Sequence, residues 1–191
     1  MKKYFLIILL VSVFASKVSA QYTIGGTTGD FSTLYEAFDY IYAGGINGDI
    51  VFRIIESTDE VYGTAVLYES GSNGGLCDYT SVTIYPTAAS CVISGDIDGP
   101  LVDLSGADNV VFDGRVNKTG SPDLIITNIS PGSNASTIKL TESSESNIFR
   151  YCIIKGSQTG TNSGVVFFSA SSAGNGNDNN TLEYNIFTSD P

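Results

Sequence analysis

The sequence predicts an all-β protein: a right-handed parallel β-helix (solenoid) with an amphipathic capping helix near its N-terminus. Short apolar runs alternate with turns rich in glycine, serine, asparagine and aspartate. In the second half, about three such runs recur in each period of 33 to 38 residues, with no helical pattern between them. Valine, isoleucine, tyrosine and phenylalanine supply the apolar residues, and there are only five prolines. Stacked coils of this kind bury one continuous apolar interior.

Residues 1–20 have the pattern of an export signal. Lys2 and Lys3 give a positive start, residues 4–14 are apolar, and Val18-Ser19-Ala20 places small residues before a cut at Gln21. The apolar run is short for a membrane span. We therefore expect a secreted or cell-surface protein that is not inserted in a membrane after the signal is removed.

The charge of the exported chain restricts its partners. Removal of the signal leaves 6 basic and 20 acidic residues. Such a surface repels nucleic acid and anionic lipid, so neither is expected as a partner. It also argues against an acidic polysaccharide as an unassisted ligand, although bridging calcium would relieve the repulsion. Calcium is therefore the one cofactor that the charge would favour, and the sequence identifies no residues as its ligands.

Residues 21–48 should form a short strand at 22–26 and the capping helix at about 32–43. Asp30 or Ser32 can cap the helix, and Gly44-Gly45 ends it. Its apolar side chains recur on one face. We expect this face to cover the first coil of the solenoid, as terminal caps do.

Residues 49–191 are assigned to the coils. Apolar runs at 49–55, 61–68, 82–85 and 91–94 precede the clearest repeat. In that repeat an asparagine begins the same strand in three coils, and asparagine both tolerates left-handed turns and stacks in hydrogen-bonded ladders. The predicted ladder consists of Asn109, Asn147 and Asn180.

Alignment on these asparagines also predicts which side chains point inward. Successive side chains of a strand point to opposite faces. The predicted core stack is Val111, Phe149 and Leu182. The next residue of each strand should point outward, which places Phe112, Arg150 and Glu183 on the surface and makes Arg150 and Glu183 neighbours.

The three cysteines leave two alternatives open. Cys77 and Cys91 could form a disulfide in an oxidising compartment. Alternatively, they are buried thiols that pack as small apolar side chains. Cys152 is expected to be a free core thiol.

The N-terminal segment resembles a known family. The residues that carry the likeness are Tyr22 to Gly26, Gly29 to Leu34, Glu36-Ala37, Gly44-Gly45 and Asp49 to Phe52. They resemble the start of pectin-lyase-like right-handed parallel β-helix proteins, and most closely the large secreted bacterial surface proteins exported by the type IX route. The resemblance implies the fold and a secreted, cell-surface setting, and it identifies function poorly. Fold alone does not assign an activity.

No catalytic residues are assigned. The chain contains no histidine, and Asp113, Arg115 and the Asp96-Ile97-Asp98 turn are interpreted as structural. Tyrosines at 62, 68, 79 and 85 could stack on sugars, although packing is the commoner role of such residues. The expected function is a non-catalytic surface module for adhesion or glycan binding. The alternative is the N-terminal part of a polysaccharide lyase or glycoside hydrolase whose catalytic coils lie beyond residue 191; in either case, further coils are expected to cover the C-terminal end.

Overall fold

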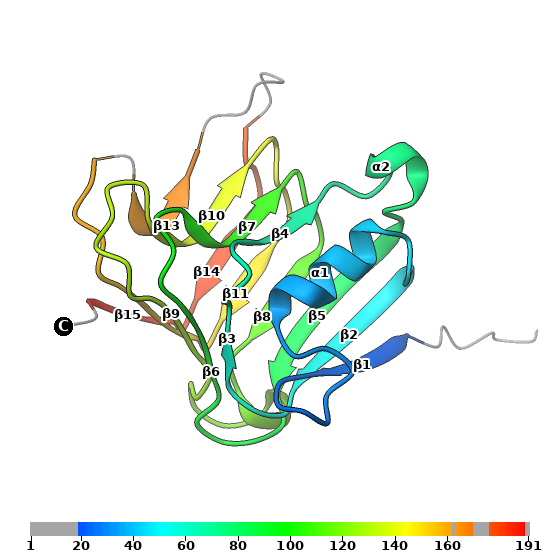
Figure 1. The fold of residues 1–191 in the computed structure, drawn as a ribbon, viewed down its shortest axis with the longest axis horizontal. Helices are drawn as coiled ribbons and strands as arrows, with labels where there is room; N and C mark the ends of the chain where they lie inside the picture. Colours follow the sequence, from blue (N-terminus) through cyan, green and yellow to red (C-terminus); the bar gives the residue numbers. More distant parts are fainter. Residues whose placement is uncertain (1–18, 162, 170–175, 190–191) are drawn as a thin grey trace, which may run out of the picture.

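The computed structural model describes residues 19–161, 163–169 and 176–189, and the segment predicted to be an export signal lies outside them except for Ser19 and Ala20. The chain winds into a parallel β-solenoid of about five turns (Figure 1). Each strand pairs in parallel with its equivalent one coil away. The predicted solenoid fold is therefore confirmed. None of the helices in the described part has the length and hydropathy needed to cross a membrane.

The described strands form three parallel sheets, one on each side of the coil. Sheet A contains β1 (Ala20–Ile24), β2 (Gly48–Ile54), β5 (Tyr79–Pro86), β8 (Val110–Asp113), β11 (Ile148–Arg150) and β14 (Thr181–Glu183). Sheet B contains β3 (Thr58–Asp59), β6 (Val92–Gly95), β9 (Ile125–Asn128), β12 (Ile153–Gly156) and β15 (Ile186–Ser189). Sheet C contains β4 (Ala65–Tyr68), β7 (Pro100–Ser105), β10 (Ser136–Thr141) and β13 (Gly164–Phe168).

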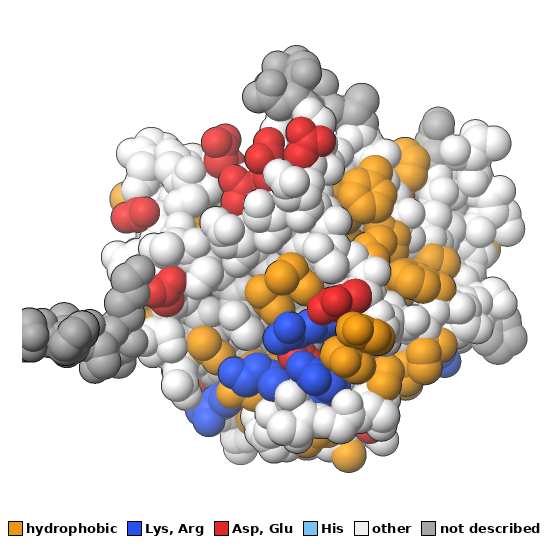
Figure 2. Space-filling model, turned by 180° about the vertical axis from the view of Figure 1, so that it is seen from behind, with side chains coloured by type: hydrophobic (Ala, Val, Ile, Leu, Met, Phe, Trp, Pro, Cys, Tyr) orange, Lys and Arg blue, Asp and Glu red, His pale blue; other side chains and the backbone are white. Residues whose placement is uncertain are grey.

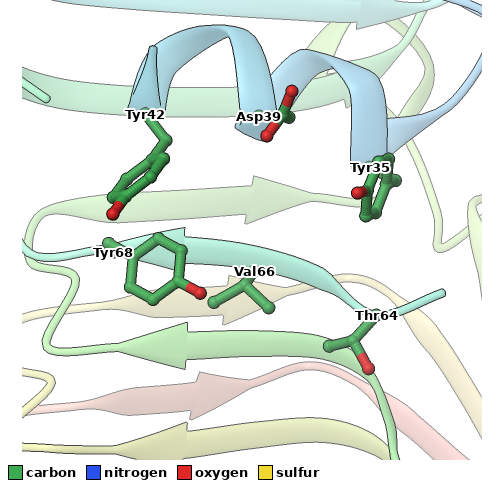
Figure 3. Close-up of a pocket in the computed structure, with 6 residues that line it drawn as sticks. All are labelled: Tyr35, Asp39, Tyr42, Thr64, Val66 and Tyr68. Carbon is green, nitrogen blue, oxygen red and sulfur yellow. The ribbon is translucent and has the colours of Figure 1, made fainter. Parts of the chain in front are cut away.

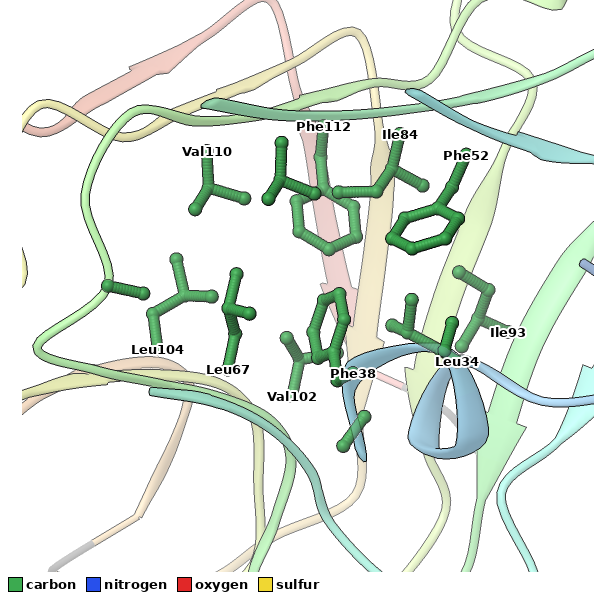
Figure 4. Close-up of a cluster of buried hydrophobic side chains, with 14 of the residues drawn as sticks. Leu34, Phe38, Phe52, Leu67, Ile84, Ile93, Val102, Leu104, Val110 and Phe112 are labelled. Carbon is green, nitrogen blue, oxygen red and sulfur yellow. The ribbon is translucent and has the colours of Figure 1, made fainter. Parts of the chain in front are cut away.

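The inward side chains of the sheets meet in one core. Phe52 and Ile84 of sheet A point toward Leu67 and Leu104 of sheet C (Figure 4). All four are at most 1% exposed. Burial alternates along the strands, as in β2, where every second residue from Ile50 to Ile54 is buried.

Helix α1 (Leu34–Tyr42) confirms the predicted amphipathic helix, although its N-cap is Thr33 and not Asp30 or Ser32. The hydroxyl of Thr33 accepts a hydrogen bond from the Glu36 amide. The apolar face of the helix joins the core through Leu34, Ala37, Phe38 and Ile41, all fully buried. Two short helical turns follow later, α2 (Ser72–Gly75) and the 3-10 helix η1 (Val116–Lys118).

A buried carboxylate holds the start of α1. Glu60, 1% exposed, accepts hydrogen bonds from the amides of Leu34 and Tyr35 at 3.0 and 2.8 Å. The first amides of a helix lack partners within the helix, so a distant carboxylate can satisfy them. Burial raises the pKa of Glu60 above its ordinary value, and these hydrogen bonds offset part of that effect.

The predicted core stack is wrong by one residue in its first coil. Phe149 pairs with Phe112 and Leu182, whereas Val111 pairs with Ile148. Phe112 is fully buried, and its ring stacks on that of Phe149 with centroids 4.8 Å apart and planes at 11°. Phe112 therefore points inward, and Val111 lies on the outer face. Leu182 shares the register but is 38% exposed.

The asparagine ladder is shorter than predicted, because Asn109 is not part of it. The Asn147 side chain donates to the Asn180 side-chain oxygen at 3.0 Å and accepts from the Val110 amide at 2.9 Å. Val110 thus occupies the ladder position of its coil. Asn109 instead takes the left-handed turn conformation (φ 58°), as do Ser146 and Asn179 one residue before the ladder asparagines.

Replacing Asn147 by alanine should lower the free energy of unfolding by about 2–3 kcal/mol, because the buried Val110 amide would lose its side-chain acceptor and the hydrogen bond to Asn180 would be lost. The same change at Asn109 should cost no more than about 1–2 kcal/mol, since only turn propensity is affected. Urea unfolding followed by circular dichroism measures both. Equal losses would contradict the ladder seen in the structure.

The cysteines form no disulfide in the structure. Cys77, Cys91 and Cys152 are all free and buried, so the buried-thiol alternative is the one observed. Burial raises the pKa of the Cys152 thiol to about 12. Its sulfur lies 3.4 Å from the Arg150 carbonyl oxygen, which agrees with its predicted place in the core.

Candidate ligand-binding face

Polar and aromatic side chains form one row across the outer face of sheet A. Arg53 pairs in register with Tyr85, and Asp113 pairs with Arg150, which pairs with Glu183. The pairing of β5 with β8 ends at Ile84 and Phe112, and Tyr85 and Asp113 are the residues that follow. These five residues, one from each coil, define the outer row. Neighbouring strands lie about 4.8 Å apart, so the outer row is roughly 19 Å long.

Two arginines meet at the centre of the outer row on one buried carboxylate. The Nε and Nη2 of Arg115 donate hydrogen bonds to the two carboxylate oxygens of Asp113, at 2.8 and 2.7 Å. The Nε of Arg150 donates to the same carboxylate at 3.0 Å. Asp113 is fully buried, whereas the two arginine side chains are 19% and 33% exposed. The charges of Asp113, Arg115 and Arg150 therefore sum to one positive charge, and the carboxylate of Glu183, the register partner of Arg150, offsets part of it.

The protonation of Asp113 follows from these contacts. Burial alone would disfavour the charged form, but the hydrogen bonds from Arg115 and the charges of Arg115 and Arg150 outweigh it. They hold the pKa of Asp113 below its ordinary value. The carboxylate is thus ionised and fixes the orientation of both guanidinium groups.

An aromatic stack adjoins the arginine cluster. The rings of Tyr151 and Tyr184 are stacked with centroids 4.8 Å apart and planes at 17°. The Arg115 guanidinium lies 4.1 Å from the centre of the Tyr151 ring, which is cation–π distance. Tyr184 is 66% exposed, so the stack presents an aromatic surface to solvent.

Gly114 allows this close approach of two coils. A side-chain carbon at position 114 would lie 2.1 Å from the Tyr151 carbonyl oxygen, a distance that no real side chain tolerates. The Gly114 amide instead donates to the Arg150 carbonyl at 2.9 Å. The glycine between Asp113 and Arg115 therefore brings the two coils close enough for Arg115 to reach Tyr151.

The same face holds most of the positive charge. Six lysines and arginines lie in the described residues, and four belong to this face. They are Arg53, Arg115, Lys118 and Arg150. Lys118 lies over the Tyr85 ring, 4.9 Å from its centre. Figure 2 shows the basic side chains gathered on one part of this face with hydrophobic side chains around them. The strongly acidic chain therefore has a locally basic and aromatic surface, here called the basic face.

The sequence interpretation missed this cluster because of the one-residue error in register. It placed Phe112 beside Arg150, whereas Asp113 occupies that position. Arg150 and Glu183 are neighbours in register as predicted. A signal was available in the sequence: alignment of the apolar Phe112 with Phe149 would have placed Asp113, Arg150 and Glu183 in one row.

The tyrosines and aspartates that the sequence offered as candidate site residues do not come together in one site. Tyr79 is buried and donates its hydroxyl to the Tyr68 carbonyl at 2.8 Å, and burial raises its pKa, so its role is structural. The Asp98 carboxylate accepts a hydrogen bond at 3.0 Å from the amide of Asn134, which is 36 residues later in the chain, so this contact joins two coils. In the described ranges, no three or more acidic, cysteine or histidine side chains are grouped so that they could hold a metal ion.

Comparison of the chain with protein-family models, with curated proteins and with solved structures gives no match. The resemblance to pectin-lyase-like and type IX surface proteins therefore stays a prediction.

Proposed function

We propose that this protein is a non-catalytic, exported β-solenoid module that binds an anionic glycan on the basic face. The observation that carries the proposal is the arginine pair on Asp113 beside the exposed Tyr151–Tyr184 stack. Aromatic rings offer an apolar surface to a sugar ring, and guanidinium groups bind carboxylate or sulfate.

This proposal revises the inference from overall charge. The net charge of the whole chain disfavours an acidic polymer, but binding depends on the local potential. The basic face has four basic side chains, whereas the outer row has two carboxylates, those of Asp113 and Glu183, so positive charge is in excess there. The outer row also has one residue from each of five successive coils, which suits an extended chain better than a compact solute.

We also propose that α1 caps the solenoid. The buried apolar face of α1 supports this proposal, since the centre of the Phe38 ring lies 6.5 Å from that of Phe52 in the core. At the opposite end, Phe187 is 49% exposed, whereas its register partner Ile154 is fully buried.

Affinity electrophoresis in gels that contain a polyuronate, a sulfated polysaccharide or a neutral glucan tests the binding proposal. The protein should be retarded by an anionic polymer and not by the neutral one, and added salt should weaken the retardation because exposed charges are screened. Equal retardation by the neutral polymer, or none by any, would overturn it. Assay of the same polymers for new chain ends tests whether this chain itself cleaves them, and we expect no new ends.

Single substitutions test whether the basic face is the surface that binds. Lys118→Gln should weaken binding about two- to fivefold through loss of one charge, and Tyr184→Ala about three- to tenfold through loss of the exposed ring. Lys155→Gln is the matched control, because it removes the same charge from β12 in sheet B. A loss for Lys155→Gln as large as that for Lys118→Gln would show that net charge alone governs retention.

A further inference from the structure

A second site lies between α1 and β4. Tyr35, Asp39 and Tyr42 are spaced four and three residues apart, so they share one side of α1. On β4, the buried Ala65 and Leu67 alternate with Val66 and Tyr68, which point outward. The two sets of side chains face each other across a small cavity of about 90 Å³ (Figure 3).

Tyrosines stand on both sides of this cavity. Tyr42 and Tyr68 lie on one side, and Tyr35 on the other (Figure 3). The Tyr42 and Tyr68 ring centres are 4.6 Å apart, and the Tyr35 ring packs at 6.0 Å against that of Tyr62. Each ring is thus held in place by a neighbour. The cavity has room for several water molecules, since one water needs roughly 10–15 Å³.

Asp39 lies between these tyrosines on the helix side of the cavity (Figure 3). In the described part of the chain, its carboxylate has no hydrogen bond and no ion pair. A free carboxylate flanked by aromatic rings attracts a cation, because both the charge and the ring faces are negative. The acidic chain as a whole adds to this attraction.

We infer that this pocket binds the quaternary ammonium group of a small organic cation. Such a group fits the pocket for three reasons. It is a few heavy atoms in size, it pairs with Asp39, and its methyl groups pack on Tyr35, Tyr42 and Tyr68, as in aromatic cages for choline-like ligands. Inorganic anions and sugar acids would be repelled by the negative charge of the unpaired Asp39 carboxylate. The inference does not depend on glycan binding, because the pocket shares no residue with the basic face.

Titration with choline chloride, followed by tyrosine fluorescence and by calorimetry, tests this inference. The chain contains no tryptophan, so the tyrosines supply the fluorescence signal. Choline should bind saturably with a dissociation constant of about 1 mM. Its neutral carbon isostere, in which a tert-butyl group replaces trimethylammonium, should bind at least about fivefold more weakly. A separate experiment uses phosphatidylcholine vesicles, whose headgroup carries the same trimethylammonium group. If the protein sediments with these vesicles, the ligand is a lipid headgroup. If the protein binds choline but does not sediment with the vesicles, the ligand is a free solute.

Two variants and a control complete the test. Asp39→Asn should weaken choline binding about fivefold, whereas Asp59→Asn, which removes an exposed carboxylate from β3, should leave it unchanged. Tyr68→Leu should weaken choline more than it weakens ammonium ion, since only choline uses the ring face. The inference fails if choline and its isostere bind alike, or if Asp59→Asn lowers affinity as much as Asp39→Asn.

Discussion

Replacing Phe112 by alanine should lower the free energy of unfolding by about 3–5 kcal/mol. The ring is fully buried and stacks on Phe149, 4.8 Å away between centroids. Alanine would leave a cavity that the neighbouring coils can fill only in part. Urea unfolding followed by far-ultraviolet circular dichroism measures the loss.

Val111→Ala is the informative control for that experiment, because the asparagine alignment predicts Val111 as the core residue. In the structure Val111 is only partly buried, on the outer face of β8. We therefore expect its replacement by alanine to cost about 1 kcal/mol or less. If Val111→Ala were the more damaging change, the register of β8 against β11 would be wrong.

Replacing Asp113 by alanine should lower the free energy of unfolding by about 3–5 kcal/mol at pH 7, because it leaves two arginines without their shared partner. The loss should exceed that of Asp113→Asn, which keeps an acceptor for Arg115. Glu183→Gln, a change on the same outer row at a partly exposed position, should alter stability by no more than about 0.5 kcal/mol. Chemical unfolding of the three variants tests this order.

The Asp113 cluster should also make stability depend on pH in a definite direction. The pKa of Asp113 in the folded chain is held below its ordinary value of 3.8. Its stabilising contribution is therefore fully present above the unfolded-state pKa and is lost as the pH falls through the lower folded-state pKa. The stability gap between the parent chain and Asp113→Asn should shrink between about pH 5 and pH 2. A constant gap would contradict this assignment.

The sequence was sufficient to predict the solenoid and the helix, because both depend on apolar periodicity. It was insufficient for the register of one coil, and the reason is physical. Asparagine suits both the left-handed turn and the ladder position that follows it. Asn109 occupies the turn, whereas Asn147 occupies the ladder. Because asparagine occurs at both of these adjacent positions, an alignment of the coils on asparagine can be wrong by one residue.

The candidate sites were harder to predict than the fold. The Asp113 cluster depends on contacts between coils, so the one-residue error hid it. The pocket beside Asp39 depends on how α1 lies against β4, which no periodicity within either segment specifies. Tyr62 and Tyr79 were both candidates from sequence, but only the three-dimensional structure shows that Tyr79 is buried and Tyr62 is exposed. The exposed Tyr184 was not predicted as a candidate.

Parallel pairing between successive coils also determines how such a chain can fold. Val82 pairs with Val110, 28 residues later, and Val111 pairs with Ile148, 37 residues later. The first pairing must therefore close a loop of roughly 30 residues, and the chain entropy lost in doing so is offset only after contacts between coils have formed. Once one coil exists, its edges act as a template for the next. Acquisition of the native state is thus expected to have a slow nucleation step and a faster growth step that proceeds along the long axis of the molecule.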